Sequence, residues 1–201
     1  FQDREPPPHW KVGGFIWWGA RPGDSPNFGG NYQRDTSLTP IHRAALANYM
    51  QSFRRHFAEK GWTRPSLFAY MIDEPDLAAN PSLASLIFDY GRALHDSGAG
   101  VEHLVTVEPR ADLIGGVDIW ATWGGGYVPA RMAERQSLGN RAWFYQHHEP
   151  FVGGNCINND GLAMTTWPWI AWRYAVDGIF LWVGNFWNED PYRQSLNWNE
   201  A

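Results

Sequence analysis

Acidic residues stand directly before a proline at the end of each of three apolar segments of this chain. The sequences are Asp73-Glu74-Pro75, Glu108-Pro109 and Glu149-Pro150. Proline has no amide hydrogen to donate to a neighbouring strand, so it ends the strand and leaves the acid at the end. In parallel α/β folds, side chains at the carboxyl ends of strands surround the ligand. These acids are therefore candidates for acid–base chemistry.

The pair Asp73-Glu74 is the strongest candidate because of the segment that precedes it. Residues 67–72 read LFAYMI, a continuous apolar run typical of a strand that is covered on both faces. Adjacent side chains of a regular strand point to opposite faces, so both acids can line one pocket only if the strand ends at or between them. Pro75 favours such an end. The simpler alternative is that both acids belong to a solvated turn before the next helix.

Paired carboxylates of this kind suit the cleavage of a glycosidic bond. One carboxylic acid protonates the leaving oxygen, and a second group stabilises the oxocarbenium-like centre. In an ordinary retaining enzyme the second group is another carboxylate about 5 to 5.5 Å from the acid, and Glu149 is the candidate. In a substrate-assisted enzyme the nucleophile is the sugar's own 2-acetamido oxygen, oriented by a neighbouring Asp. The adjacent Asp73 and Glu74 suit the second arrangement, and both remain open.

Aromatic residues gather at the same predicted strand ends. The chain has 13 Trp, 8 Tyr and 11 Phe in 201 residues, and flat amphipathic rings suit both cores and the apolar faces of sugars. Those at or just beyond strand ends are Trp120, Trp123, Tyr145, Trp182 and Trp187. We expect Trp120, Tyr145, Trp182 and Trp187, together with the amide of Asn185, to bind the substrate. Trp167, Trp169 and Trp172 lie on a predicted helix, where we expect them to be core residues.

Composition and charge exclude several other classes of function. The net charge is −5 and the basic residues are scattered, which gives no footprint for nucleic acid or an anionic membrane. No apolar run approaches the roughly 20 residues of a membrane span. Adjacent His147 and His148 would point opposite ways on a strand, and the single Cys156 forms neither an internal disulfide nor a thiolate cluster. We expect no metal and no cofactor.

Apolar segments alternate with helical patterns along the chain. Strands are predicted near residues 11–18, 67–72, 101–107, 116–122, 141–148 and 179–183, and helices near 40–60, 81–96, 128–138 and 164–176. This alternation predicts βαβ units and a parallel sheet. Because every strand ends in polar or aromatic residues, a (β/α)₈ TIM-type barrel fits better than an open sheet. A full barrel takes about 250 residues. We therefore expect residues 1–201 to form one barrel domain, without its first one or two strands and apparently truncated at the N-terminus.

Four segments resemble the catalytic domain of glycoside hydrolase family 123. They are HFAEKGW at 56–62, FAYMIDEP at 68–75, VDIWAT at 117–122 and WPWIAWRYAVDGIFLWVGNFW at 167–187. They follow the family's order and span roughly residues 40 to 190. The resemblance implies a barrel and a β-N-acetylgalactosaminidase-like activity that proceeds by substrate assistance. By position, it makes Glu74 the general acid/base and Asp73 the residue that orients the acetamido group.

Two alternatives to this function stay open. An ordinary two-carboxylate retaining glycosidase would use Glu74 as acid/base and Glu149 as nucleophile. Barrel enzymes of that kind carry Asn before the acid, and Asp73 stands in that place here. The second alternative is a barrel that binds glycans without catalysing a reaction. Failure to hydrolyse an aryl β-N-acetylgalactosaminide would indicate it.

Overall fold

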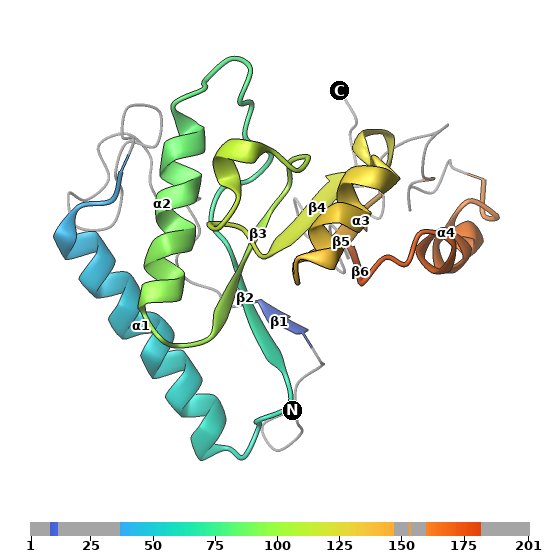
Figure 1. The fold of residues 1–201 in the computed structure, drawn as a ribbon. Helices are drawn as coiled ribbons and strands as arrows, with labels where there is room; N and C mark the ends of the chain where they lie inside the picture. Colours follow the sequence, from blue (N-terminus) through green and yellow to red (C-terminus); the bar gives the residue numbers. More distant parts are fainter. Residues whose placement is uncertain (1–8, 12–36, 147–152, 154–159, 182–201) are drawn as a thin grey trace, which may run out of the picture.

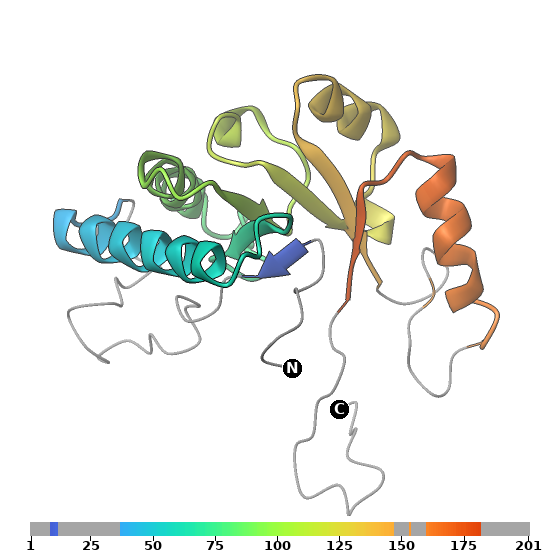
Figure 2. The ribbon, with the colours of Figure 1, turned by 90° about the horizontal axis from the view of Figure 1, so that it is seen from below.

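The centre of the fold is a parallel sheet that curls into an arc. The computed structural model describes residues 9–11, 37–146, 153 and 160–181. Within these ranges the sheet has six strands in chain order, and each pairs in parallel with the next. The strands are β1 His9–Lys11, β2 Ser66–Tyr70, β3 Val101–Val105, β4 Ile119–Trp123, β5 Arg141–Tyr145 and β6 Gly178–Phe180. Figure 2 shows the helices on the convex side of this arc. The α/β fold and a curled, partial barrel are confirmed, whereas a barrel of eight strands stays a prediction.

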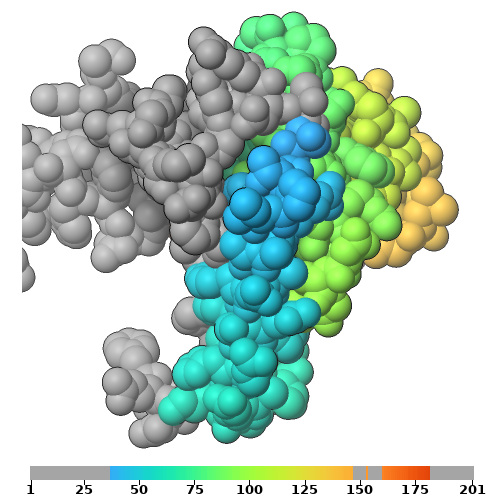
Figure 3. Space-filling model, turned by 90° about the vertical axis from the view of Figure 1, so that its left-hand side faces the viewer, coloured from blue at the N-terminus to red at the C-terminus, as the bar shows by residue number. Residues whose placement is uncertain are grey.

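The helices follow the strands as a βαβ pattern requires. They are α1 Pro40–Glu59, α2 Leu83–Asp96, α3 Pro129–Ser137 and α4 Trp167–Arg173, with short 3₁₀ turns at Ala111–Leu113, Gly124–Gly126 and Met164–Thr166. The helix α1 begins where the sequence predicts, because the Thr39 side chain accepts a hydrogen bond from the His42 amide at 3.2 Å and Pro40 follows the cap. Figure 3 shows α1 along the outside of the molecule with α2 beside it. None of the helices in the described part of the chain is long and apolar enough to cross a membrane.

Alternation along the strands places apolar side chains on both faces of the sheet. On the convex side, Leu67, Val101, Val105, Trp120 and Ala142 pack with residues of α1 and α2. On the concave side, Phe68, Tyr70, Leu104, Ile119, Ala121 and Trp143 pack with Phe180. Residues two positions apart on one strand therefore share a face. We call the concave side the inner face.

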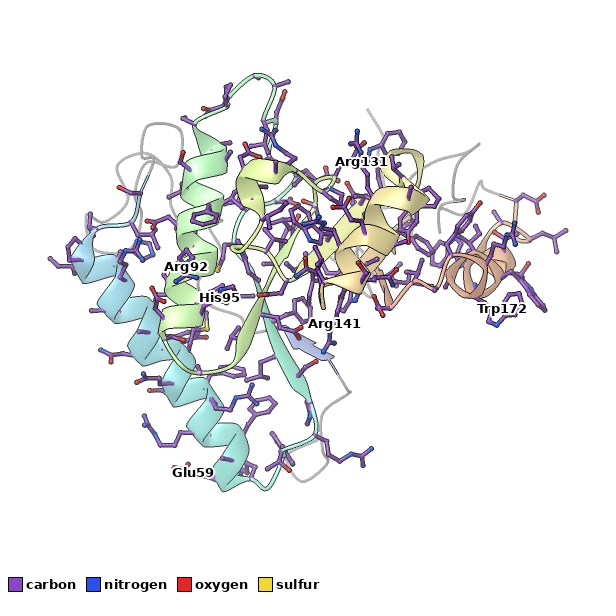
Figure 4. The ribbon with its side chains drawn as sticks, viewed as in Figure 1. Glu59, Arg92, His95, Arg131, Arg141 and Trp172 are labelled. Atoms are coloured by element: carbon purple, nitrogen blue, oxygen red, sulfur yellow. The ribbon has the colours of Figure 1, made fainter. Side chains whose placement is uncertain are left out.

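The helix α2 approaches the sheet closely through two glycines. A Cβ atom on Gly91 would lie 1.7 Å from the carbonyl oxygen of Gly116, in the loop before β4. A glycine in the middle of a helix usually weakens it, and here it permits direct contact between two backbones. Two residues from this contact, Asp118 Oδ2 lies 2.8 Å from both His95 Nε2 and the His103 amide nitrogen. His95 comes from α2 (Figure 4), so this carboxylate joins α2, β3 and the start of β4.

His103 is a buried imidazole in the middle of β3, and it makes stability depend on pH. Its Nδ1 lies 2.7 Å from the Gly116 carbonyl oxygen, which can only accept, so Nδ1 carries the hydrogen. Burial lowers the pKa of His103 from 6.5 to about 4, although the Gly116 carbonyl and the Asp118 carboxylate act the other way. The nearby His95 lowers it further.

We expect the folded state to lose stability as the pH falls from about 6.5 to about 4. Over this interval the unfolded chain binds a proton that the native His103 does not, so protonation favours unfolding. A pKa difference from 6.5 to about 4 corresponds to about 3 kcal/mol. Urea unfolding at pH 7 and pH 4.5 measures the loss. His103→Asn keeps a donor for Gly116 and should reduce the difference between the two pH values; an unchanged difference would assign it to other groups.

The element ends differ from the sequence prediction in places. The first strand lies at residues 9–11 and overlaps the predicted strand 11–18 only at its start, and most of that predicted strand lies outside the described residues. The prediction that Trp169 and Trp172 are core residues is wrong, since they are 72% and 81% exposed. Trp167 is buried, and it shares the packed side of α4 with Ile170 and Ala171 at helical spacing. Figure 4 shows Trp172 pointing away from the rest of the protein.

Candidate active site

Asp73 and Glu74 lie at the carboxyl edge of the sheet, just after β2. The strand ends at Tyr70, the next two residues are buried, and the acids follow, with Asp73 half-buried and Glu74 exposed. Glu74 has a φ of +35°, in the left-handed region that residues with a Cβ atom rarely adopt. The chain therefore leaves the strand geometry at this residue, and the two carboxylates are not held to opposite faces.

Each acid accepts a hydrogen bond from a tyrosine of the inner face. The Tyr70 hydroxyl donates to Asp73 Oδ1, and the Tyr145 hydroxyl donates to Glu74 Oε1 at 2.5 Å. Tyr70 ends β2 and Tyr145 ends β5. Glu74 and Tyr145 are 71 positions apart in the sequence and meet at one edge of the sheet. The structure thus brings together three predicted site residues, Asp73, Glu74 and Tyr145.

Both tyrosines are neutral donors at physiological pH. Burial raises the pKa of Tyr145, and the hydrogen bond to Glu74 and the charges of Glu74 and Asp73 raise it further. Burial also raises the pKa of Tyr70, with the hydrogen bond to Asp73 as the next largest cause. A phenol that keeps its proton can donate to a carboxylate throughout the range in which enzymes work. Each acid therefore has a fixed donor of its own.

Tyr70 and Thr106 are site residues that sequence reasoning missed. Thr106 directly follows β3, and its Oγ1 lies 2.9 Å from the Tyr70 hydroxyl and accepts from the Glu74 amide at 2.8 Å. The only signal in the sequence is alternation: Tyr70 shares a face with Phe68, and Thr106 shares one with Leu104. Alternation alone does not say which face of a sheet buried on both sides carries the chemistry.

Trp120 does not lie at the proposed binding edge, which corrects our expectation. Its side chain is 0% exposed and belongs to the convex core, and its Nε1 donates to Asn140 Oδ1 at 3.3 Å. A ring without accessible surface cannot stack on a sugar. Trp120 is thus a packing residue between the sheet and the outer helices.

Trp123 takes the position that we had expected for Trp120. It ends β4 on the same side of the strand as Ile119 and Ala121, and its register partner on β5 is Tyr145. Its ring packs against the turn that follows, because Cβ atoms on Gly125 and Gly126 would lie 2.1 and 2.9 Å from ring atoms. The glycines of this turn therefore make room for an indole beside the tyrosine that contacts Glu74.

We expect Trp123→Ala to weaken glycan binding, and Trp120→Phe to leave it unchanged. Loss of a stacking aromatic typically costs about 1 to 3 kcal/mol, whereas Trp120 contributes only to packing. Calorimetric titration of each variant with the sugar product measures the dissociation constants. Thermal unfolding of the same samples should show a larger loss of stability in Trp120→Phe than in Trp123→Ala, because Trp120 is fully buried in the core. Equal binding by wild type and Trp123→Ala would make Trp123 a support for the glycine turn alone.

The other candidate residues divide into two groups. Glu108 forms an ion pair with Arg131 of α3 at 3.0 Å, with both side chains about half exposed, so its charge has a partner on the surface. Trp182, Asn185, Trp187 and Glu149 lie outside the described residues, and their roles stay predictions. Among the residues that the structure describes, no three His, Cys, Asp or Glu side chains form a group that could hold a metal ion.

Comparison with known proteins identifies the family. The model of the glycoside hydrolase 123 catalytic domain matches residues 27–200, and no curated protein matches the chain. Among solved structures, a family 123 glycoside hydrolase from Clostridium perfringens, described in work on glycolipid glycan hydrolysis, is similar with a TM-score of 0.55 and 16% identity. That match covers 78% of this chain and 28% of the other, and it supports the fold. Since the family model spans most of the sequence, the chain belongs to family 123 of the glycoside hydrolases.

Proposed function

We propose that this protein removes a terminal β-linked N-acetylhexosamine, most readily N-acetylgalactosamine, from a glycan with retention of configuration. The observation that carries the proposal is the pair of adjacent acids, each with its own tyrosine donor at the carboxyl edge of the sheet. Family membership supports hydrolysis of a glycosidic bond. The choice of sugar rests on the adjacent Asp73 and Glu74 and on the family resemblance together.

In the proposed first step, Glu74 protonates the leaving oxygen while the acetamido oxygen of the substrate attacks the anomeric carbon. Asp73 orients the acetamido group and balances the positive charge of the oxazolinium ion that forms. Glu74 becomes a carboxylate at this point, and the Tyr145 hydroxyl, 2.5 Å from Oε1, stabilises it by donating a hydrogen bond. In the second step the Glu74 carboxylate accepts a proton from the water that opens the oxazolinium ring.

The substrate preference of the purified protein tests the proposal. An aryl β-N-acetylgalactosaminide should be hydrolysed, and the matching aryl β-galactoside, which has a 2-hydroxyl group in place of the acetamido group, should not. Proton NMR of the first product formed should show the β-anomer. Comparable cleavage of both sugars would indicate a two-carboxylate mechanism, and binding of the sugar without cleavage of either would indicate a glycan-binding protein.

A further inference from the structure

We propose that Thr106 is a positioning residue for both catalytic acids, acting through a directed chain of hydrogen bonds that includes Tyr70. The inference rests on the proposed function of Asp73 and Glu74. It adds a residue from a different strand end, whose hydroxyl contacts the Glu74 amide and the Tyr70 hydroxyl and acts through them. We call Thr106 and Tyr70 together the hydroxyl pair.

The chemistry of the end groups fixes the direction of the chain. The Glu74 amide can only donate, and it points to Thr106 Oγ1 at 2.8 Å. An ionised Asp73 carboxylate can only accept, so the single proton of Tyr70 goes to Asp73 Oδ1. The two hydroxyl groups are 2.9 Å apart, so Thr106 donates its proton to the Tyr70 oxygen. The order is Glu74 amide to Thr106, Thr106 to Tyr70, and Tyr70 to Asp73, and hydrogen bonds in such a chain strengthen one another.

The hydroxyl pair is buried, so water cannot easily take the place of either hydroxyl group in these hydrogen bonds. Thr106 and Tyr70 are each 8% exposed, so a Glu74 amide that lost Thr106 would have few other acceptors. A more distant contact of 3.3 Å from this amide to the Tyr70 oxygen involves the same pair. Removing the Thr106 hydroxyl therefore leaves this partly buried amide with only the more distant Tyr70 oxygen, and it takes away the hydrogen bond from Thr106 to that oxygen.

The backbone of Glu74 shows what the chain holds in place. A φ of +35° is unfavourable for a residue with a Cβ atom, and such conformations persist where the surroundings fix them. The hydrogen bond that the Glu74 amide donates to Thr106 fixes this conformation at the residue that we propose as the acid/base. At the other end of the series of hydrogen bonds, Tyr70 fixes the carboxylate of Asp73, which we propose orients the acetamido group. The hydroxyl pair thus sets the relative placement of the two acids.

Thr106→Val, which keeps the shape and removes the hydroxyl group, tests this role. We expect kcat on an aryl β-N-acetylgalactosaminide to fall by up to about 100-fold, since small misplacements of catalytic groups can have effects of that size, while KM changes little. Thr106→Ser restores the hydroxyl group and should recover most of kcat. Thr122→Val is the matched control, because Thr122 is buried on β4 and its hydroxyl has no hydrogen-bond partner among the described residues.

A second measurement tests the series of hydrogen bonds without using activity. The Glu74 amide should exchange slowly with solvent deuterium, as measured by NMR, in wild type, Thr106→Ser and Thr122→Val, and rapidly in Thr106→Val. Slow exchange in Thr106→Val, or a Thr106→Ser variant as impaired as Thr106→Val, would overturn the proposal. The two ideas can fail separately: cleavage of sugars without an acetamido group would remove the proposed mechanism, and the exchange experiment would still decide whether Thr106 holds Glu74.

Discussion

Glu74→Gln is expected to lower kcat/KM by about 10²- to 10⁴-fold on glycosides with poor leaving groups, the usual contribution of a general acid. An alkoxide leaving group needs a proton in the transition state, and glutamine cannot supply it. Aryl glycosides with acidic phenols leave without that help, so their loss should be much smaller. Initial rates on a matched pair of N-acetylgalactosaminides, one with an alkyl and one with a nitrophenyl leaving group, measure the difference.

Glu108→Gln is the control for this experiment. Glu108 is another acid that follows a strand and precedes proline, but it is paired with Arg131 of α3 at 3.0 Å, whereas Asp73 and Glu74 each accept from a tyrosine. We expect near wild-type rates on both substrates, with at most a small change in stability because the ion pair is exposed. Equal losses on both substrates in Glu74→Gln would show that Glu74 supports the structure of the site without transferring a proton.

Asp73→Asn is expected to be nearly as damaging as the loss of Glu74, about 10²- to 10³-fold in kcat, the range for a single preorganised electrostatic group. The asparagine oxygen can still accept from Tyr70, so the placement of the side chain should survive. The negative charge that balances the oxazolinium ion is lost. Rates on an aryl β-N-acetylgalactosaminide and inhibition by a thiazoline that mimics the intermediate measure the effect. The thiazoline should inhibit wild type strongly, because a site binds a high-energy intermediate better than the substrate.

Glu149→Gln separates this mechanism from its alternative. If the substrate supplies the nucleophile, this variant should keep most of its activity and thiazoline sensitivity. A two-carboxylate enzyme would give the opposite pattern, in which galactosides are cleaved well, the thiazoline has no effect and Glu149 is indispensable. A fluorosugar would then leave a covalent glycosyl group on Glu149, detectable as an increase in protein mass.

Most of the sheet could be predicted from the sequence because its strands are buried on both faces. The continuous apolar run before Asp73 indicated β2, and the mainly apolar segments that follow indicated β3 and β5, which begin at residues 101 and 141 as predicted. The position of β1 was harder. His9–Lys11 pairs with residues 66–68, but these residues follow three prolines and are too few to show a pattern. Backbone pairing with β2, which the sequence does not display, makes this segment a strand.

The sequence indicates where along the chain the candidate site residues lie, but it does not show which face of each strand they occupy. Apolar residues cover both faces of a parallel strand, so the sequence does not show which face of β4 lines the site. Side chains an odd number of positions apart on a strand lie on opposite faces, and Trp123 is three positions from the buried Trp120. Thr106 was not predicted because its partners Tyr70 and Glu74 lie more than 30 positions away. Its role depends on pairing between β2 and β3.

The strand order has a consequence for how this protein folds. Every strand pairs with its neighbours in the sequence, from β1 to β6, so no pairing requires a distant segment to arrive first. The entropy lost on closing each loop is that of a single crossover, whereas pairing with a strand farther along the chain would close a longer loop and cost more. The sheet can therefore lengthen by one βα unit at a time while the polypeptide is still being synthesised. Asp73 and Glu74 would meet Thr106 when the third strand docks, before Tyr145 has left the ribosome.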